Sequence, residues 1–155
     1  MFKKIAALAL ILVLVALCTR RPFDVRTGEV MPNTCNAGQF AAAVDEFDDI
    51  AAARDQAFAR IEALSLDEPA EYVRRWNSEL GALRELGERA DRVTAPRCLA
   101  HARELFEQYL EQSQYAAQLR APNADMEVYA NARETAQVIR SQYASEVKLQ
   151  EKNRI

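Results

Sequence analysis

Hydrophobic and polar residues alternate with a helical period over most of this 155-residue chain. Between residues 37 and 150, apolar side chains recur at steps of three and four, which places them on one stripe of a helix. Three short breaks interrupt the period, and each contains or precedes a proline that favours a helix boundary. The pattern predicts four helices of similar length, over residues 37–64, 67–93, 95–120 and 124–150.

The short connections between these helices predict how they pack. Loops of two to four residues force neighbouring helices to run antiparallel. Because each helix carries one apolar stripe, four of them can enclose a single core. The sequence therefore predicts an all-α fold, an up-down-up-down four-helix bundle over residues 37–150. A long helical hairpin or a three-helix array that dimerises is the alternative.

Residues 1–18 show a different pattern. Lys3 and Lys4 precede an unbroken apolar run from Ile5 to Leu17, and Cys18 follows. A basic start and a short apolar core are typical of a bacterial export leader. As a helix the run spans about 20 Å, which is short for a hydrocarbon core of about 30 Å. We therefore expect an extracytoplasmic, membrane-associated protein, in the periplasm or on the outer cell surface.

The processing of this leader remains open among three fates. Cys18 stands where a lipoprotein carries its lipid, although Leu17 replaces the small residue expected before such a cysteine. The leader can instead be cleaved, or be retained as an anchor. Arg20 and Arg21 fit none of the three well, because basic residues after an apolar run resist translocation.

The remaining residues complete the domain plan. Residues 19–36 hold two prolines and no periodic pattern, so we expect a flexible tether, and residues 151–155 are expected to form a polar tail. All 23 acidic residues and all but two of the basic residues lie beyond Cys18. The exported part is therefore acidic, which disfavours nucleic acid as a partner.

Two of the three cysteines are expected to pair. If a lipid or the leader claims Cys18, Cys35 and Cys98 remain. Cys35 precedes the first predicted helix and Cys98 begins the third, and these two helices start at the same end of an up-down-up-down bundle. Because an exported chain meets an oxidising compartment, we predict a disulfide between them.

Catalytic and metal-binding motifs are weak. His101 is the only histidine, and with Cys98 or Glu104 it provides at most half of a metal site. The chain lacks paired Glu-x-x-His motifs, a Cys-x-x-Cys-His haem motif, a Gly-x-Ser-x-Gly elbow and a glycine-rich phosphate loop. We therefore expect no cofactor, no metal and no enzymatic activity.

One charged residue interrupts an apolar stripe. Arg54 falls on the inward stripe of the first helix, where a guanidinium must find partners or reach solvent. Gln112 lies at a similar level on the third helix, so the two are expected to form a polar layer in mid-bundle. Such a layer either fixes helix register or binds a small anionic ligand.

These patterns favour a non-enzymatic function. We expect a helical bundle of the bacterial cell envelope that acts as a structural or protein-interaction module. Its expected partners are the membrane, through the leader or a lipid, and a protein that the sequence does not identify, with a homodimer as one form. The alternative is a small-ligand-binding or sensory bundle with its site around Arg54.

Overall fold

The computed structural model describes residues 35–121 and 125–153, which all belong to the compact unit Asn33–Ile155. In this part of the chain every regular element is helical, which confirms the all-α prediction. The predicted leader, Cys18 and nearly all of the predicted tether lie outside the described residues. The elements are α2 (Ala37–Glu62), α3 (Pro69–Asp91), the 3-10 turn η1 (Arg97–Leu99), α4 (Ala100–Leu119) and α5 (Met126–Asn153).

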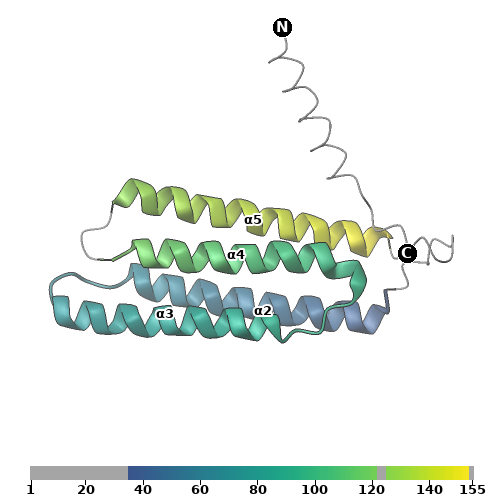
Figure 1. The fold of residues 1–155 in the computed structure, drawn as a ribbon, viewed down its shortest axis with the longest axis horizontal. Helices are drawn as coiled ribbons and strands as arrows, with labels where there is room; N and C mark the ends of the chain where they lie inside the picture. Colours follow the sequence, from purple (N-terminus) through teal and green to yellow (C-terminus); the bar gives the residue numbers. More distant parts are fainter. Residues whose placement is uncertain (1–34, 122–124, 154–155) are drawn as a thin grey trace, which may run out of the picture. The chain divides into compact units, whose positions relative to one another are not determined.

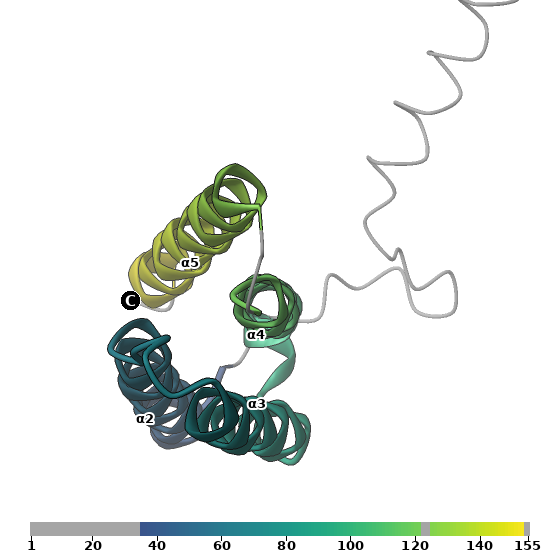
Figure 2. The ribbon, with the colours of Figure 1, turned by 90° about the vertical axis from the view of Figure 1, so that its left-hand side faces the viewer.

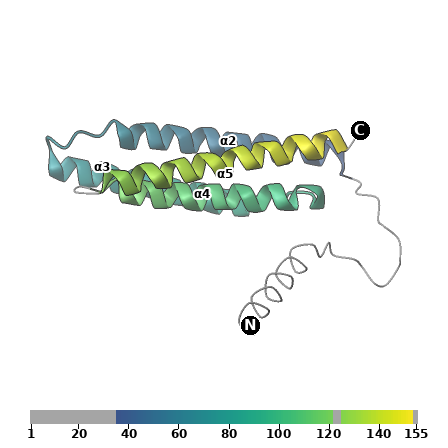
Figure 3. The same ribbon diagram turned by 90° about the horizontal axis from the view of Figure 1, so that it is seen from above.

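The four long helices lie side by side, and successive helices run in opposite directions (Figure 1). Viewed along the bundle, α2 neighbours α3, α3 neighbours α4, and α4 neighbours α5 (Figure 2). From above, α5 extends alongside both α4 and α2 (Figure 3). The order is the predicted one, with two antiparallel hairpins packed against each other.

The helix ends differ from the prediction by a few residues. α2 ends at Glu62, before the predicted residue 64. Its last turn is a tighter, three-residue turn, in which the Leu64 amide donates to the Ile61 carbonyl at 3.3 Å. The predicted third helix is split, because η1 follows Pro96 before α4 begins. α5 continues to Asn153, into the predicted polar tail.

Side chains from α3 and α4 satisfy each other's terminal carbonyls. The Trp76 indole donates to the Ala117 carbonyl at 2.9 Å, and the Tyr72 hydroxyl donates to the Arg120 carbonyl. In return, Arg103 of α4 donates to the Asp91 carbonyl at 3.1 Å. Because the last carbonyls of a helix have no partner within it, these bonds fix the relative position of α3 and α4.

The structure joins Cys35 to Cys98 by a disulfide, as the sequence predicts. Their Cα atoms lie 5.9 Å apart, within the normal range for a disulfide. Cys35 precedes α2, where the Asn36 side chain accepts from the Gly38 amide at 2.9 Å and caps the helix. The bond therefore ties the start of the α2–α3 hairpin to the start of the α4–α5 hairpin.

The core consists of two apolar clusters along the bundle. The cluster nearer the disulfide is aromatic, with ring centroids of Phe47 and Phe106 at 4.7 Å and of Phe106 and Tyr143 at 5.1 Å. The other cluster packs around Phe58 and Ile61. Between them in sequence, on α2, lies Arg54.

Candidate functional site

Arg54 is buried in mid-bundle, with 3% of its side chain exposed. Its Nε donates to Ser113 Oγ of α4 at 2.9 Å, and its Nη1 donates to Asp55 Oδ1 at 2.9 Å. The guanidinium carbon lies 3.8 Å from the centre of the Phe58 ring and 5.0 Å from that of Tyr109. A hydrogen bond, an ion pair and two aromatic faces thus offset the desolvation of this charge.

Asp55 is the anion at the centre of this cluster. It accepts from Arg54, from the Tyr109 hydroxyl at 3.3 Å and from Arg140 Nη1 of α5 at 2.7 Å. Burial alone would raise the pKa of Asp55, but the hydrogen bonds and charges of the two guanidinium groups lower it below its ordinary value. Burial raises the pKa of Tyr109 to about 12, so its hydroxyl remains a donor at neutral pH.

The predicted contact between Arg54 and Gln112 is not formed in the structure. Gln112 donates to the Ala132 carbonyl of α5 at 3.4 Å instead. The neighbouring Ser113 is fully buried and faces Arg54, because the inward stripe of α4 passes through position 113 at this level. The polar layer exists, but a serine and the next residue of α2 form it in place of a glutamine.

Two ion pairs lie along the seam between α2 and α5, and the first of them belongs to this cluster. Asp55 and Glu62 are seven residues apart on α2, and Arg140 and Arg133 are seven apart on α5. Arg140 pairs with Asp55 at 2.7 Å, and Arg133 pairs with Glu62 at 3.0 Å. The Tyr129 hydroxyl also donates to Glu62 at 2.9 Å. Equal spacing on two antiparallel helices produces a ladder of acid–arginine pairs.

The ladder ends after two pairs, because no arginine lies opposite the third acidic residue of the series. Asp48 continues the acidic series at the same spacing, but the register of the other two pairs places Val147 opposite it. No ion pair reaches Asp48 from the described residues. Its pKa is raised, first by burial and then by the negative charges of Asp45 and Asp49, while Arg140 opposes the rise. This end of the seam therefore holds a carboxylate that is stabilised less than its neighbours.

Two buried polar atoms in this region have no hydrogen-bond partner within the described residues. They are Arg54 Nη2 and the Tyr143 hydroxyl. Burial raises the pKa of Tyr143, and the charge of Asp48 raises it further. Both groups are donors at neutral pH, so each leaves a buried donor that a water molecule or a small anion could satisfy.

The half-site around His101 lies on the surface. His101 Nδ1 is 3.5 Å from Glu104 Oε2, and both side chains are exposed. The Cys98 sulfur is bonded to Cys35 and is not free to ligate. In residues 35–121 and 125–153, no group of three or more His, Cys, Asp or Glu side chains is placed to hold a metal ion.

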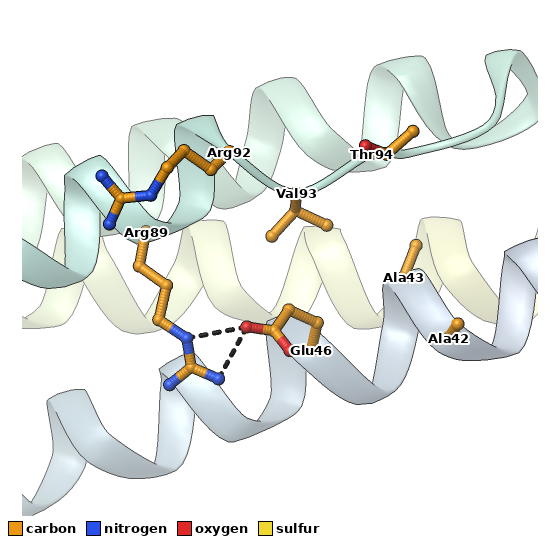
Figure 4. A pocket seen from close by; sticks show the side chains of 7 residues that line it. All are labelled: Ala42, Ala43, Glu46, Arg89, Arg92, Val93 and Thr94. Carbon is orange, nitrogen blue, oxygen red and sulfur yellow. Dashed lines mark hydrogen bonds and ion pairs between the residues drawn. The ribbon is translucent and has the colours of Figure 1, made fainter.

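The surface of the bundle carries shallow hollows. One of about 390 Å³ lies between α2 and α3, where Arg89 Nε donates to Glu46 Oε1 at 2.7 Å beside Val93 (Figure 4). A second, of about 690 Å³, runs as a groove between α4 and α5. Arg54 lines neither of them.

Comparison with known proteins gives no relative for this chain. No protein-family model, no curated protein and no solved structure matches it. Among the helices of the described residues, none combines the length and the apolar character needed to span a bilayer.

Proposed function

We propose that this protein is an exported, membrane-associated helical bundle of the bacterial cell envelope that acts as a non-enzymatic structural or protein-interaction module. The observation that carries the proposal is the exposure of large apolar side chains on α5. Met126, Val128, Val138 and Leu149 each expose 40% or more of their surface. Val138 and Leu149 line one groove between α4 and α5. Exposed apolar side chains that gather at one place on a surface mark protein interaction sites.

The membrane part of the proposal rests on residues 1–18. Their basic start and apolar run are what an export leader requires, and Cys18 is the residue that a lipid would modify. Mass spectrometry of the protein recovered from its native membrane fraction tests this part. We expect either a mature N-terminus at or near Cys18 or a retained leader, together with the Cys35–Cys98 bond. A full chain in the cytoplasmic fraction with reduced cysteines would contradict export.

Photo-crosslinking in the native membrane tests the interaction part. A photoreactive residue at position 138, on α5, is compared with one at position 84, which is exposed on α3. We expect a discrete crosslinked product from position 138 and a much weaker one from position 84. Equal labelling at both positions, or turnover of hydrolase substrates by the pure protein, would count against an interaction module.

A second candidate function is the binding of a small ligand, such as a small anion, at the polar site around Arg54. The free Nη2 of Arg54 is the observation that favours it. Asp55 competes for the same guanidinium, so a ligand must displace this carboxylate or share it. Thermal unfolding with phosphate or a small dicarboxylate, for the wild type and for Arg54→Met, tests this candidate. Unfolding temperatures that the anions leave unchanged at 10 mM, about 100 times a Kd of roughly 0.1 mM, would exclude such a site.

A further inference from the structure

The outward face of α5 forms one continuous stripe. From Glu127 to Lys152, positions at steps of three and four fall on the side of the helix opposite its buried residues, and every one of them is exposed. Val138 and Leu149 lie on this stripe, 52% and 50% exposed. We call it the α5 stripe.

The charges of the α5 stripe are divided between its two halves. Glu127 and Glu134 lie in the N-terminal half, and Lys152, with the adjacent Lys148, lies in the C-terminal half. None of these four side chains forms an ion pair within the described residues, whereas both arginines of α5 do. The helix dipole accounts for charges in the first and last turns, but its effect fades beyond them and does not reach Glu134.

A groove runs beside the stripe. It lies between α4 and α5 and has a volume of about 690 Å³. Its apolar lining is Leu105 of α4 with Val138 and Leu149 of α5, and polar side chains, Glu146 among them, line the rest. A helix laid along α5 would therefore bury apolar side chains from two helices at once, which is the usual mode of helix-in-groove recognition.

We propose that the α5 stripe and this groove form a self-association surface, on which α5 of a second copy packs antiparallel. The proposal rests on the proposed function, because it names the partner of the interaction module. An antiparallel arrangement places Lys148 and Lys152 of each copy beside Glu134 and Glu127 of the other. Val138 then lies near the two-fold axis, because it is close to the midpoint of the stripe. A parallel arrangement would place like charges together.

The size of the surface sets the expected affinity. The 28 residues of α5 span about 42 Å, and a strip about 10 Å wide covers about 400 Å² per copy. A standard interface buries about 800 Å² per partner, so the α4 side of the groove must contribute as well. We expect a dimer with a Kd in the micromolar range.

Charge exchange in the full chain tests the antiparallel arrangement. Sedimentation velocity in detergent micelles is measured for the wild type, for Lys148→Glu/Lys152→Glu, for Glu127→Lys/Glu134→Lys, and for an equimolar mixture of the two variants. We expect each variant alone to dimerise at least tenfold more weakly than the wild type, and the mixture to restore the dimer. Arg84→Glu/Arg92→Glu, at exposed positions in α3 and at its C-cap, changes the net charge as the lysine variant does and should dimerise like the wild type.

Association through residues 1–34 would be equal in all of these chains. A monomeric wild type at several hundred micromolar, equal association of every variant, or a mixture that stays monomeric would each overturn the proposal. Each of these results leaves an interaction with a different protein intact, so failure here is distinct from failure of the proposed function. Circular dichroism of every variant confirms that the helices are retained.

Discussion

At the scale of single residues, Arg54 and Asp55 are not equivalent partners. Removing Asp55 leaves the buried guanidinium without its nearest anion, whereas removing Arg54 leaves Asp55 still paired with Arg140. We expect Asp55→Asn to lower the free energy of unfolding by about 2 kcal/mol, below the 3–5 kcal/mol of a fully buried pair because Asp55 is 40% exposed.

The matched variant is Arg54→Met. It fills the same volume with apolar atoms, and Ser113 keeps its bond to the Tyr109 carbonyl, so we expect a loss of less than about 1 kcal/mol. Urea unfolding of the two variants and of their combination measures the difference. A larger loss for Arg54→Met than for Asp55→Asn would mean that the contacts of Arg54 with Ser113 and with the two aromatic rings matter more than its ion pair.

The same carboxylate predicts an acid sensitivity. Because the pKa of Asp55 is lower in the folded state than in the unfolded state, its contribution to stability is complete above the unfolded value of about 4 and is lost as the pH falls through the folded value. We expect stability to fall below pH 4 in the wild type, and to fall less steeply in Asp55→Asn. Urea unfolding at steps between pH 6 and pH 2.5 provides the measurement.

Asp48 is the internal control for this prediction. Its pKa is raised in the folded state, so ionisation weakens the fold as the pH rises through that value. Asp48→Asn should therefore be as stable as the wild type or more stable at pH 7, with the acid loss below pH 4 retained. A parallel response of Asp48→Asn and Asp55→Asn would contradict the opposite shifts of the two carboxylates.

The sequence predicted the position of the polar layer better than its members. Arg54 stood out because it interrupts an apolar stripe, but a stripe defines only a face and does not choose between Gln112 and Ser113. Asp55 and Arg140 lie at the edge of that face, where the pattern reads as ordinary surface. Their seven-residue spacing from Glu62 and Arg133 was the signal that could have located the ladder.

At the scale of helices, the prediction of four long helices is confirmed. The helical period identifies the residues on their buried faces only in part. Val73 and Met126 fall at helical steps of three and four from the buried residues of α3 and α5, yet they expose 41% and 52% of their surface. Each lies at the edge of its stripe and near the start of its helix, where fewer neighbours remain to cover it. Periodicity gives a direction for each side chain, whereas coverage depends on how far the adjacent helices extend.

Two glycines of α3 give a matched test of local packing. A Cβ at Gly81 would meet no atom within 4 Å, whereas one at Gly87 would lie 3.1 Å from Gln114 Nε2, which donates to the Leu83 carbonyl. We expect Gly81→Ala to raise the free energy of unfolding by about 0.5–1 kcal/mol, because alanine favours a helix and loses less entropy on folding. Gly87→Ala should gain little or nothing, since Gln114 must move. Equal gains in the free energy of unfolding, measured with urea, would show that the Gln114 side chain moves without an energetic cost.

At the scale of the whole molecule, the two hairpins meet along contacts of different kinds. α3 and α4 join through carbonyl caps and apolar side chains, and α2 and α5 join through the acid–arginine ladder. The disulfide adds a covalent link at one end only. The sequence predicted this link because it depends on topology and cysteine count, both of which can be read from the chain.

The disulfide leads to the last prediction. Cys35 and Cys98 are 63 residues apart, and closing such a loop stabilises the fold by about 4 kcal/mol in the chain-entropy description. We expect Cys35→Ser/Cys98→Ser to lose about this amount in urea unfolding, whereas Cys18→Ser should match the wild type. Hydrogen exchange should rise first in the initial turns of α2, since Asn36 then remains as their nearest constraint. Exchange that rises uniformly along α2 and α4 would instead mean that the bond supports the entire core.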